Sequence, residues 1–157
     1  MPHSLTAGDP APAFSLPDEA GGSRSLADFA GKKLVLYFYP QDNTPTCTQE
    51  AIDFNRLKGA FQKAETEIVG ISPDPLKSHS KFKTKHALDL TLLSDEQRAV
   101  LEAYGVWKEK VMFGNRYMGV ERTTFLIDAQ GKIAQVWNKV RIKGHAEAVL
   151  QAAEALG

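Results

Sequence analysis

The chain has 157 residues, of which 43% are apolar and 24% charged, and its 19 basic and 19 acidic side chains leave no formal net charge. This length predicts one domain over residues 1–157, and the composition excludes disordered, collagen-like and low-complexity classes. A chain without net positive charge is not expected to have nucleic acid as its main partner.

The sequence also argues against a membrane or secreted location. Its longest apolar run covers residues 34–39, whereas a membrane span needs about 20 residues, and residues 1–10 lack the features of a signal peptide. The single cysteine cannot form a disulfide within the chain, and a lone thiol suits a reducing compartment. We therefore expect a cytoplasmic protein.

The first half of the chain carries a strand, a helix and a second strand. Residues 33–39 are almost entirely apolar, which is typical of a strand covered on both faces in a mainly parallel sheet. Residues 47–61 repeat apolar side chains at spacings of three and four, which predicts one amphipathic helix. A second apolar strand follows at residues 67–71. This order predicts a βαβ unit with a right-handed crossover.

The second half is expected to contain helices at both ends and a hairpin between them. Helices are predicted over residues 75–86, 94–105 and 145–156. Strands at residues 123–127 and 132–137 flank a four-residue turn. A βαβ half followed by a ββα half predicts an α/β, thioredoxin-like fold, with a mixed central sheet flanked by helices on both faces.

Residues 107–118 show no clean period, and we expect a long loop rich in large apolar side chains, among them Phe113, Tyr117 and Met118. Such a loop usually packs against its own domain. The alternatives are that it walls the thiol pocket or docks a partner.

Cys47 lies between the buried strand and its helix, at the strand end where open α/β sheets bind ligands. Thr44 as N-cap with Pro45 at the first helical position would place Cys47 in the first turn; alternatively Thr46 is the cap, with Gln49 closing a capping box. Both frames aim unpaired backbone N–H groups and the helix dipole at the sulfur, and both favour the thiolate.

The helix dipole alone is too weak to activate a thiol. It supplies about 0.3–1 kcal/mol, whereas a cysteine with an ordinary pKa of about 8.5 needs roughly 3.4 kcal/mol to reach a pKa of about 6. Cys47 also shares the apolar face of its helix, and burial by itself opposes ionisation. A cation must supply the rest, and we expect Arg122, just before a strand beside the central one, to reach the sulfur.

The simpler interpretation of Cys47 is a small inert core residue, because a lone cysteine on an apolar helical face usually only packs. The Thr44-x-x-Cys47 spacing after a strand favours redox chemistry instead. It resembles a Cys-x-x-Cys redox turn in which a hydroxyl replaces the first thiol.

These residues resemble the active-site signature of the peroxiredoxins, in particular the bacterioferritin comigratory protein or peroxiredoxin Q branch. The centre of the resemblance is a Pro-x-x-x-Thr-x-x-Cys pattern formed by Pro40, Thr44 and Cys47. It extends over nearly the whole chain, through residues 8–14, 92–95, 104–107, 122–128 and 143–145. The resemblance implies a thioredoxin-fold thiol peroxidase whose peroxidatic residue is Cys47. It also implies that Pro40 shields the sulfur, Thr44 hydrogen-bonds the peroxide, and Arg122 holds both thiolate and peroxide.

The chain departs from many members of this branch because it has no second, resolving cysteine. One usual position is Ile52, and the other lies in the helix predicted over residues 75–86, which contains no cysteine. We therefore expect a one-cysteine cycle without a metal or organic cofactor. An external thiol such as glutathione, thioredoxin or glutaredoxin would reduce the sulfenic acid, or Cys47 of another copy would do so.

Other polar groups are given smaller roles. Glu50 is expected on the helix flank, orienting its neighbours. The four histidines, at positions 3, 79, 86 and 145, have no metal-ligand spacing and receive no role. Basic residues at 77–85 and 139–143 are expected to form solvated faces.

The sequence thus predicts a cytoplasmic peroxidase, monomeric or weakly dimeric, for hydrogen peroxide and organic hydroperoxides. The rivals are a thiol transferase or glutathione-peroxidase-like enzyme and a redox-inactive binding module on the same fold.

Overall fold

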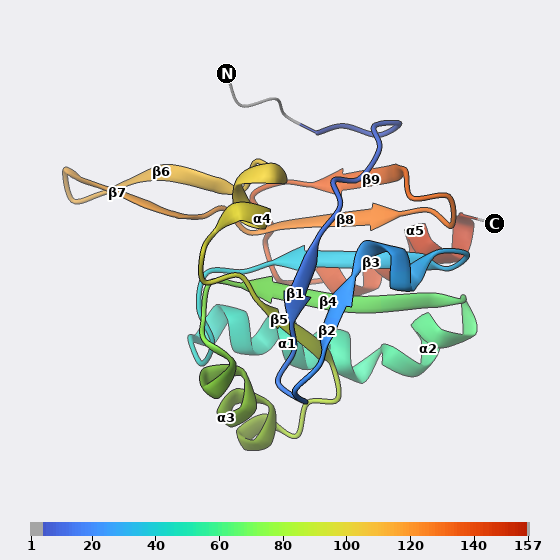
Figure 1. Ribbon diagram of the computed structural model, residues 1–157, viewed down its shortest axis with the longest axis horizontal. Helices are drawn as coiled ribbons and strands as arrows, with labels where there is room; N and C mark the ends of the chain where they lie inside the picture. Colours follow the sequence, from blue (N-terminus) through green and yellow to red (C-terminus); the bar gives the residue numbers. More distant parts are fainter. Residues whose placement is uncertain (1–4, 157) are drawn as a thin grey trace.

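A five-stranded mixed sheet forms the centre of the molecule (Figure 1). The computed structural model describes residues 5–156. Across the sheet the strands are ordered β5 (Thr91–Ser94), β4 (Thr66–Ser72), β3 (Lys33–Phe38), β8 (Thr123–Ile127) and β9 (Ile133–Trp137). The first three are parallel to one another, whereas β8 runs antiparallel to both β3 and β9.

The central strand β3 is continuously apolar because side chains from its two faces enter two separate cores. Leu34, Leu36 and Phe38 belong to one buried cluster, whereas Val35 and Tyr37 belong to the other. The prediction of a thioredoxin-like fold with a mixed sheet is confirmed.

Helices cover both faces of the sheet. One core receives side chains from α1 (Pro45–Arg56), α2 (Lys58–Lys63), α3 (Leu76–His86) and α5 (His145–Ala155). The other core receives side chains from β1 (Ser15–Pro17), the short helix η1 (Leu26–Phe29) and α4 (Ala99–Ala103). Strand β2 (Ser23–Ser25) pairs with β1 outside the main sheet. Of the described residues, no helix combines the length and apolar character needed to cross a membrane.

The single helix predicted over residues 47–61 is wrong in its continuity. The helix α1 begins at Pro45, which one of the two predicted caps places at the first helical position, and it gives way to α2 at Leu57. The backbone N–H of Leu57 is shared between the carbonyls of Asp53 and Phe54, which tightens the last turn of α1. The apolar period continues through this irregularity, so the sequence pattern conceals it.

The helix predicted over residues 94–105 is also wrong at its start. Ser94 ends strand β5, which the sequence analysis missed, and α4 begins only at Ala99 after Arg98 adopts a left-handed φ of 65°. The carboxylate of Asp95 accepts a hydrogen bond from the backbone N–H of Leu101 at 2.8 Å. Asp95 thus satisfies a donor in the first turn of α4 although it lies before the helix. A four-residue strand gives little periodic signal, and its pairing with β4 decides its conformation.

Residues 107–118 do not form the predicted loop. They belong to a hairpin of β6 (Trp107–Met112) and β7 (Asn115–Val120), which projects away from the main sheet in Figure 1. Its turn places Phe113 and Gly114 at φ 53° and 80°, as a type I′ turn requires. Most of the hairpin is exposed, so no inward and outward alternation marks its strands in the sequence.

Candidate active site

Cys47 lies in the first turn of α1, just beyond the end of β3. Thr44 is the N-cap and Pro45 opens the helix, so the first of the two predicted frames is confirmed and the Thr46 cap is wrong. The sulfur-bearing residue is only 2% exposed. The thiol therefore lies, nearly dehydrated, in the helical turn whose backbone N–H groups have no partner within the helix.

Arg122 brings a cation to this sulfur, as the sequence predicts. Its Nη2 donates to Cys47 Sγ at 3.2 Å, and its side chain is 12% exposed. The contact follows from topology: β8 is antiparallel to β3, and Thr123 pairs with Phe38, so the start of β8 lies beside the end of β3. Two residues 75 positions apart thus meet at one edge of the sheet.

Glu50 occupies the other arm of the same guanidinium. Arg122 Nη1 donates to Glu50 Oε1 at 2.7 Å, while Glu50 Oε2 is buried and finds no partner in the described part of the chain. Burial raises the pKa of Glu50 to about 7, because the loss of water outweighs the attraction of Arg122. The expected position on the helix flank is wrong, since a residue one turn after Cys47 shares its inward face.

The loop before α1 carries the other two predicted site residues. Pro40 directly follows Tyr39 at the end of the buried segment and is half-buried. The Thr44 hydroxyl donates to the Gln41 carbonyl at 3.0 Å instead of capping the helix. With its proton directed there, the Thr44 oxygen keeps lone pairs to accept a hydrogen bond from another molecule.

Two buried groups beside the site were not predicted. Burial raises the pKa of Tyr37 well above its ordinary value, with Glu50 and Cys47 adding to the shift, and its hydroxyl lacks a partner within residues 5–156. His145 contacts Thr124 through Nε2 at 2.9 Å, and burial together with Arg122 lowers the pKa of His145 to about 4. A neutral ring there leaves Arg122 as the cation that contacts the sulfur. His145 belongs to the stretch 143–145 that shares in the family resemblance, which could have pointed to it, whereas Tyr37 is one of several apolar residues of its strand and carries no signal of its own.

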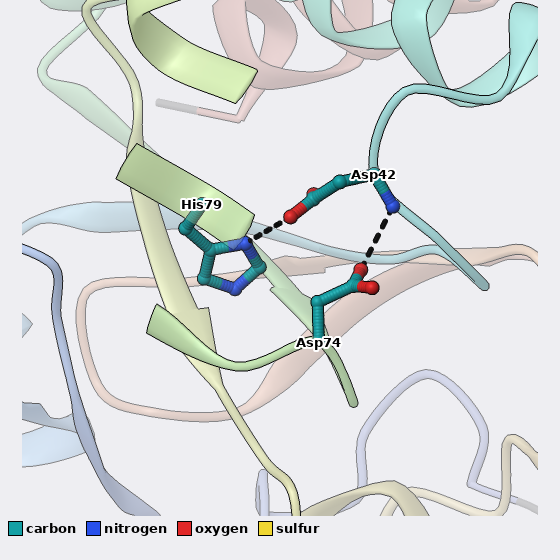
Figure 2. Close-up of side chains that lie close together, drawn as sticks. All are labelled: Asp42, Asp74 and His79. Atoms are coloured by element: carbon teal, nitrogen blue, oxygen red, sulfur yellow. Dashed lines mark hydrogen bonds and ion pairs between the residues drawn. The ribbon is translucent and has the colours of Figure 1, made fainter. Parts of the chain in front are cut away.

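Asp42, Asp74 and His79 form a second cluster beside the same loop (Figure 2). One potential ligand atom from each lies within 4.8 Å of the others, so the distances alone would suit a metal ion. However, His79 Nδ1 faces Asp42 Oδ2 at 2.7 Å and His79 Nε2 faces the Leu93 carbonyl at 3.0 Å. A ring whose two nitrogens both face acceptors offers no lone pair to a metal, so these three residues form a hydrogen-bonded cluster.

The sequence assigns His79 no role, because its partners are distant along the chain. Asp42 precedes it by 37 positions, and only the crossover of the βαβ unit brings α3 against the loop. His3 lies outside the described residues.

Comparison with known proteins agrees with this geometry. The AhpC/TSA family model matches residues 7–136. Peroxiredoxin Bcp of Bacillus subtilis is 45% identical over 148 residues, which cover 94% of this chain and 94% of the relative. Peroxiredoxin Bcp of Xanthomonas campestris is 46% identical over 148 residues, with coverages of 93% and 92%.

Solved structures give the same result. Xanthomonas campestris bacterioferritin comigratory protein, which has alkyl peroxide reduction activity, superposes with a TM-score of 0.89 at 42% identity and covers 95% of this chain and 98% of its own. Peroxiredoxin Q of the same organism has been solved with either of two cysteines replaced by serine, whereas this chain has one cysteine. The chain therefore belongs to the AhpC/TSA family, and it is a peroxiredoxin of the bacterioferritin comigratory protein branch, a thiol-dependent peroxidase.

Proposed function

We propose that Cys47 is the residue that attacks the peroxide, and that Arg122, Thr44 and Pro40 complete the catalytic site. The observation that carries this proposal is the 3.2 Å contact between Arg122 Nη2 and the buried Cys47 sulfur. A guanidinium this close stabilises a thiolate, which is the reactive form of cysteine.

In the reaction, the Cys47 thiolate attacks one oxygen of the peroxide in line with the O–O bond. An S–O bond forms as the O–O bond breaks, so sulfur loses two electrons and the peroxide gains them. The departing oxygen takes a proton and leaves as water or an alcohol, and Cys47 becomes a sulfenic acid. Sulfur carries both electrons, so the step uses no metal or organic cofactor.

The site is built to stabilise charge on the departing oxygen. Arg122 donates from a fixed fork, because its other arm is held by Glu50 at 2.7 Å. The first-turn N–H groups of α1 supply further donors. The Thr44 oxygen accepts a hydrogen bond from the O–H group of the peroxide. Donors fixed before the reaction are worth far more than mobile ones. Pro40 lies in the loop before α1 and has no backbone N–H to bind water, and in this proposal its ring shields the sulfur from solvent.

The substrates we propose are hydrogen peroxide and small organic hydroperoxides. The alkyl peroxide reduction activity of the Xanthomonas campestris relative supports the second class. The leaving group of either substrate meets the same charge-stabilising groups, so the site does not require one particular alkyl chain.

The reductant we propose is an external thiol, namely glutathione, thioredoxin or glutaredoxin. Ile52 occupies one position where relatives of this branch carry a resolving cysteine, and α3 contains no cysteine. Two thiols of the reductant would return Cys47 to the thiol, releasing water and forming a disulfide in the reductant. We propose a monomer or weak dimer, with residues 1–157 as one domain, in the reducing cytoplasm that a lone thiol suits.

Rapid mixing of the reduced protein with peroxide, followed by thiol trapping and intact-mass measurement, tests this function. We expect fast second-order loss of the Cys47 thiol, a mass gain of one oxygen, and reversal by at least one of the three thiol donors. Reaction with disulfides alone would indicate a thiol transferase, and an inert thiol would indicate a binding module. The Cys47→Ser variant serves as the blank.

A further inference from the structure

The loop of residues 40–44 is fixed by contacts with α3 and with the segment before it. Asn43 has a left-handed φ of 62°, which asparagine tolerates better than most residues other than glycine, so these contacts and not backbone strain fix the loop. The loop ends at Thr44, the N-cap of the helix that carries Cys47. A small movement of this loop would displace both the Thr44 oxygen and the first turn of α1.

The Asp42 side chain anchors the centre of the loop through its hydrogen bonds. Its Oδ1 accepts the Tyr39 hydroxyl at 2.7 Å, and its Oδ2 accepts the Ser78 hydroxyl at 2.8 Å and faces His79 Nδ1 at 2.7 Å. The Asp42 side chain is 1% exposed. A carboxylate without water is stable only when its lone pairs are taken, and here Tyr39, just after β3, and donors from α3 take them.

His79 acts as a cation in this cluster because both of its nitrogens face acceptors. Nε2 meets the Leu93 carbonyl, which can only accept, so Nε2 must carry a proton. Nδ1 meets the Asp42 carboxylate, which also accepts when ionised. Burial opposes charge on the ring, but the hydrogen bond and charge of Asp42 outweigh it, so the pKa of His79 is raised and the pKa of Asp42 is lowered.

Asp74 ties the backbone of the loop to the end of β4. Its Oδ2 accepts the Asp42 backbone N–H at 2.8 Å, as Figure 2 shows, and the Ser72 hydroxyl at 2.7 Å. Its own carbonyl accepts the Ser94 hydroxyl at 2.5 Å. The titratable groups that face His79 are Tyr39 just after β3, Asp42 from the loop and Asp74 from the segment before α3.

We propose that the buried ion pair of Asp42 and protonated His79 is the positioning element for peroxide reduction, which holds the loop and the first turn of α1 around Cys47. The inference rests on the proposed role of Cys47. Neither Asp42 nor His79 touches the sulfur or the peroxide, so both act through Thr44 and the helix start. Loss of the His79 proton would leave one ring nitrogen facing an acceptor without a hydrogen and would release the loop.

The sign of the pH dependence follows from the raised pKa of His79. The support given by its proton is complete below the ordinary value of 6.5 and is lost as the pH rises through the higher value in the folded protein. We therefore expect the rate constant for Cys47 oxidation by hydrogen peroxide to fall on the alkaline side of its pH profile.

The test compares wild-type protein with His79→Gln, Asp42→Asn and the double variant. Each single variant should lower the oxidation rate constant at pH 7 by about 10-fold to 100-fold through misplacement of reacting groups. The double variant should lose no more than either single one, because both remove the same pair. In His79→Gln the alkaline decline should also disappear. The matched control is Lys81→Gln, an exposed residue of the same helix outside the contacts to residues 40–44, which should retain both rate and profile.

Nitrogen-15 NMR of the wild-type ring provides a measurement that does not depend on variants folding. Protons on both nitrogens of His79 at pH 6.5 are expected, and a single proton there would overturn the proposal. It would also be overturned if His79→Gln kept the wild-type rate and alkaline decline while wild-type Cys47 reacts fast. A wild-type Cys47 that does not react with peroxide would instead contradict the proposed function, and the NMR result would still report on His79.

Discussion

The single positive charge of Arg122 lies between two ionisable groups, the Cys47 thiol and the Glu50 carboxyl. Its two arms reach Cys47 at 3.2 Å and Glu50 at 2.7 Å, and both partners are almost completely buried. If both partners ionise, the site holds one more negative charge than positive in a place without water. The rise in the pKa of Glu50 to about 7 relieves this excess, because Glu50 is then partly neutral when the thiolate forms.

Replacing Glu50 by glutamine should therefore change how stability depends on pH. A carboxyl whose pKa rises from 4.5 to about 7 on folding favours the native state below pH 4.5, and this contribution is lost as the pH rises through about 7. We expect the free energy of unfolding of Glu50→Gln, relative to wild type, to shift in favour of the variant by on the order of 3 kcal/mol between pH 4.5 and pH 8. Urea unfolding at several pH values measures this, with Glu102→Gln on the exposed surface of α4 as the control. A difference that does not vary with pH would contradict the assignment.

The sequence predicted the contact between Arg122 and Cys47 and the burial of Cys47, but not the burial of Glu50. Cys47 and Arg122 could be paired in advance, because a thiol at a helix start needs a cation and a strand end can supply one. Glu50 shows the limit, since its helical spacing was visible but its burial depends on how β8 and α1 pack. His79 shows it more strongly, because its two partners come from a loop and from β5, a strand that the sequence did not reveal.

Helix α5 packs against the two elements that position the site residues, β8 and α1. Its first residue, His145, hydrogen-bonds Thr124 on β8, and its ring packs edge-on against Phe54 of α1 at 5.9 Å between centroids. Thr124 lies two positions after Arg122. The start of α5 thus contacts both elements that bring Arg122 and Cys47 together.

His145 should make the protein sensitive to acid. Its pKa falls from 6.5 to about 4 on folding, so the neutral ring contributes stability above pH 6.5 that is lost as the pH falls through about 4. Between pH 6.5 and pH 4 the wild type should lose free energy of unfolding on the order of 3 kcal/mol through this ring. We expect His145→Gln to lack this loss. Thermal unfolding between pH 4 and pH 7 checks the expectation against His86→Gln, a partly exposed histidine on α3. An unchanged acid slope in His145→Gln would show that another group causes it.

The elements that the sequence missed are those without a buried face or with too few residues. The hairpin of β6 and β7 exposes Val111 at 66% and Phe113 at 95%, so no alternation of apolar and polar residues could reveal its strands. Strand β5 has only four residues. Three of them are buried, and Leu92 and Leu93 enter the two different cores. By contrast, β3, β8 and α5 have a strong period or a long apolar run, and each was placed to within one or two residues.

At the scale of the whole molecule, the single thiol determines the catalytic cycle. Peroxiredoxin Q of Xanthomonas campestris has two cysteines, each of which has been replaced by serine in a solved structure, whereas this sequence has Cys47 alone. The sulfenic acid that we propose at Cys47 would therefore wait for a thiol from another molecule. A waiting sulfenic acid is open to attack on a second peroxide, which yields an irreversible sulfinic acid.

We therefore expect excess peroxide without a thiol donor to produce a mass gain of one oxygen and then of two. Glutathione added before the peroxide should prevent the second gain. Intact-mass measurement over time follows both species, and Cys47→Ser should remain unmodified throughout. A stable dimer linked through Cys47, in place of the second oxygen, would show that another copy of the chain resolves the sulfenic acid.

The measurement that tests the account most directly is the rate constant for Cys47 oxidation by hydrogen peroxide in wild type and in Arg122→Met. Methionine keeps much of the arginine stem but removes the charge and both hydrogen bonds of the guanidinium. Loss of one such donor in a preorganised site typically costs about 10²-fold to 10³-fold in rate. The account predicts a decrease of at least this size with the thermal transition of a folded protein retained. An Arg122→Met variant that is folded and oxidised at the wild-type rate would contradict it.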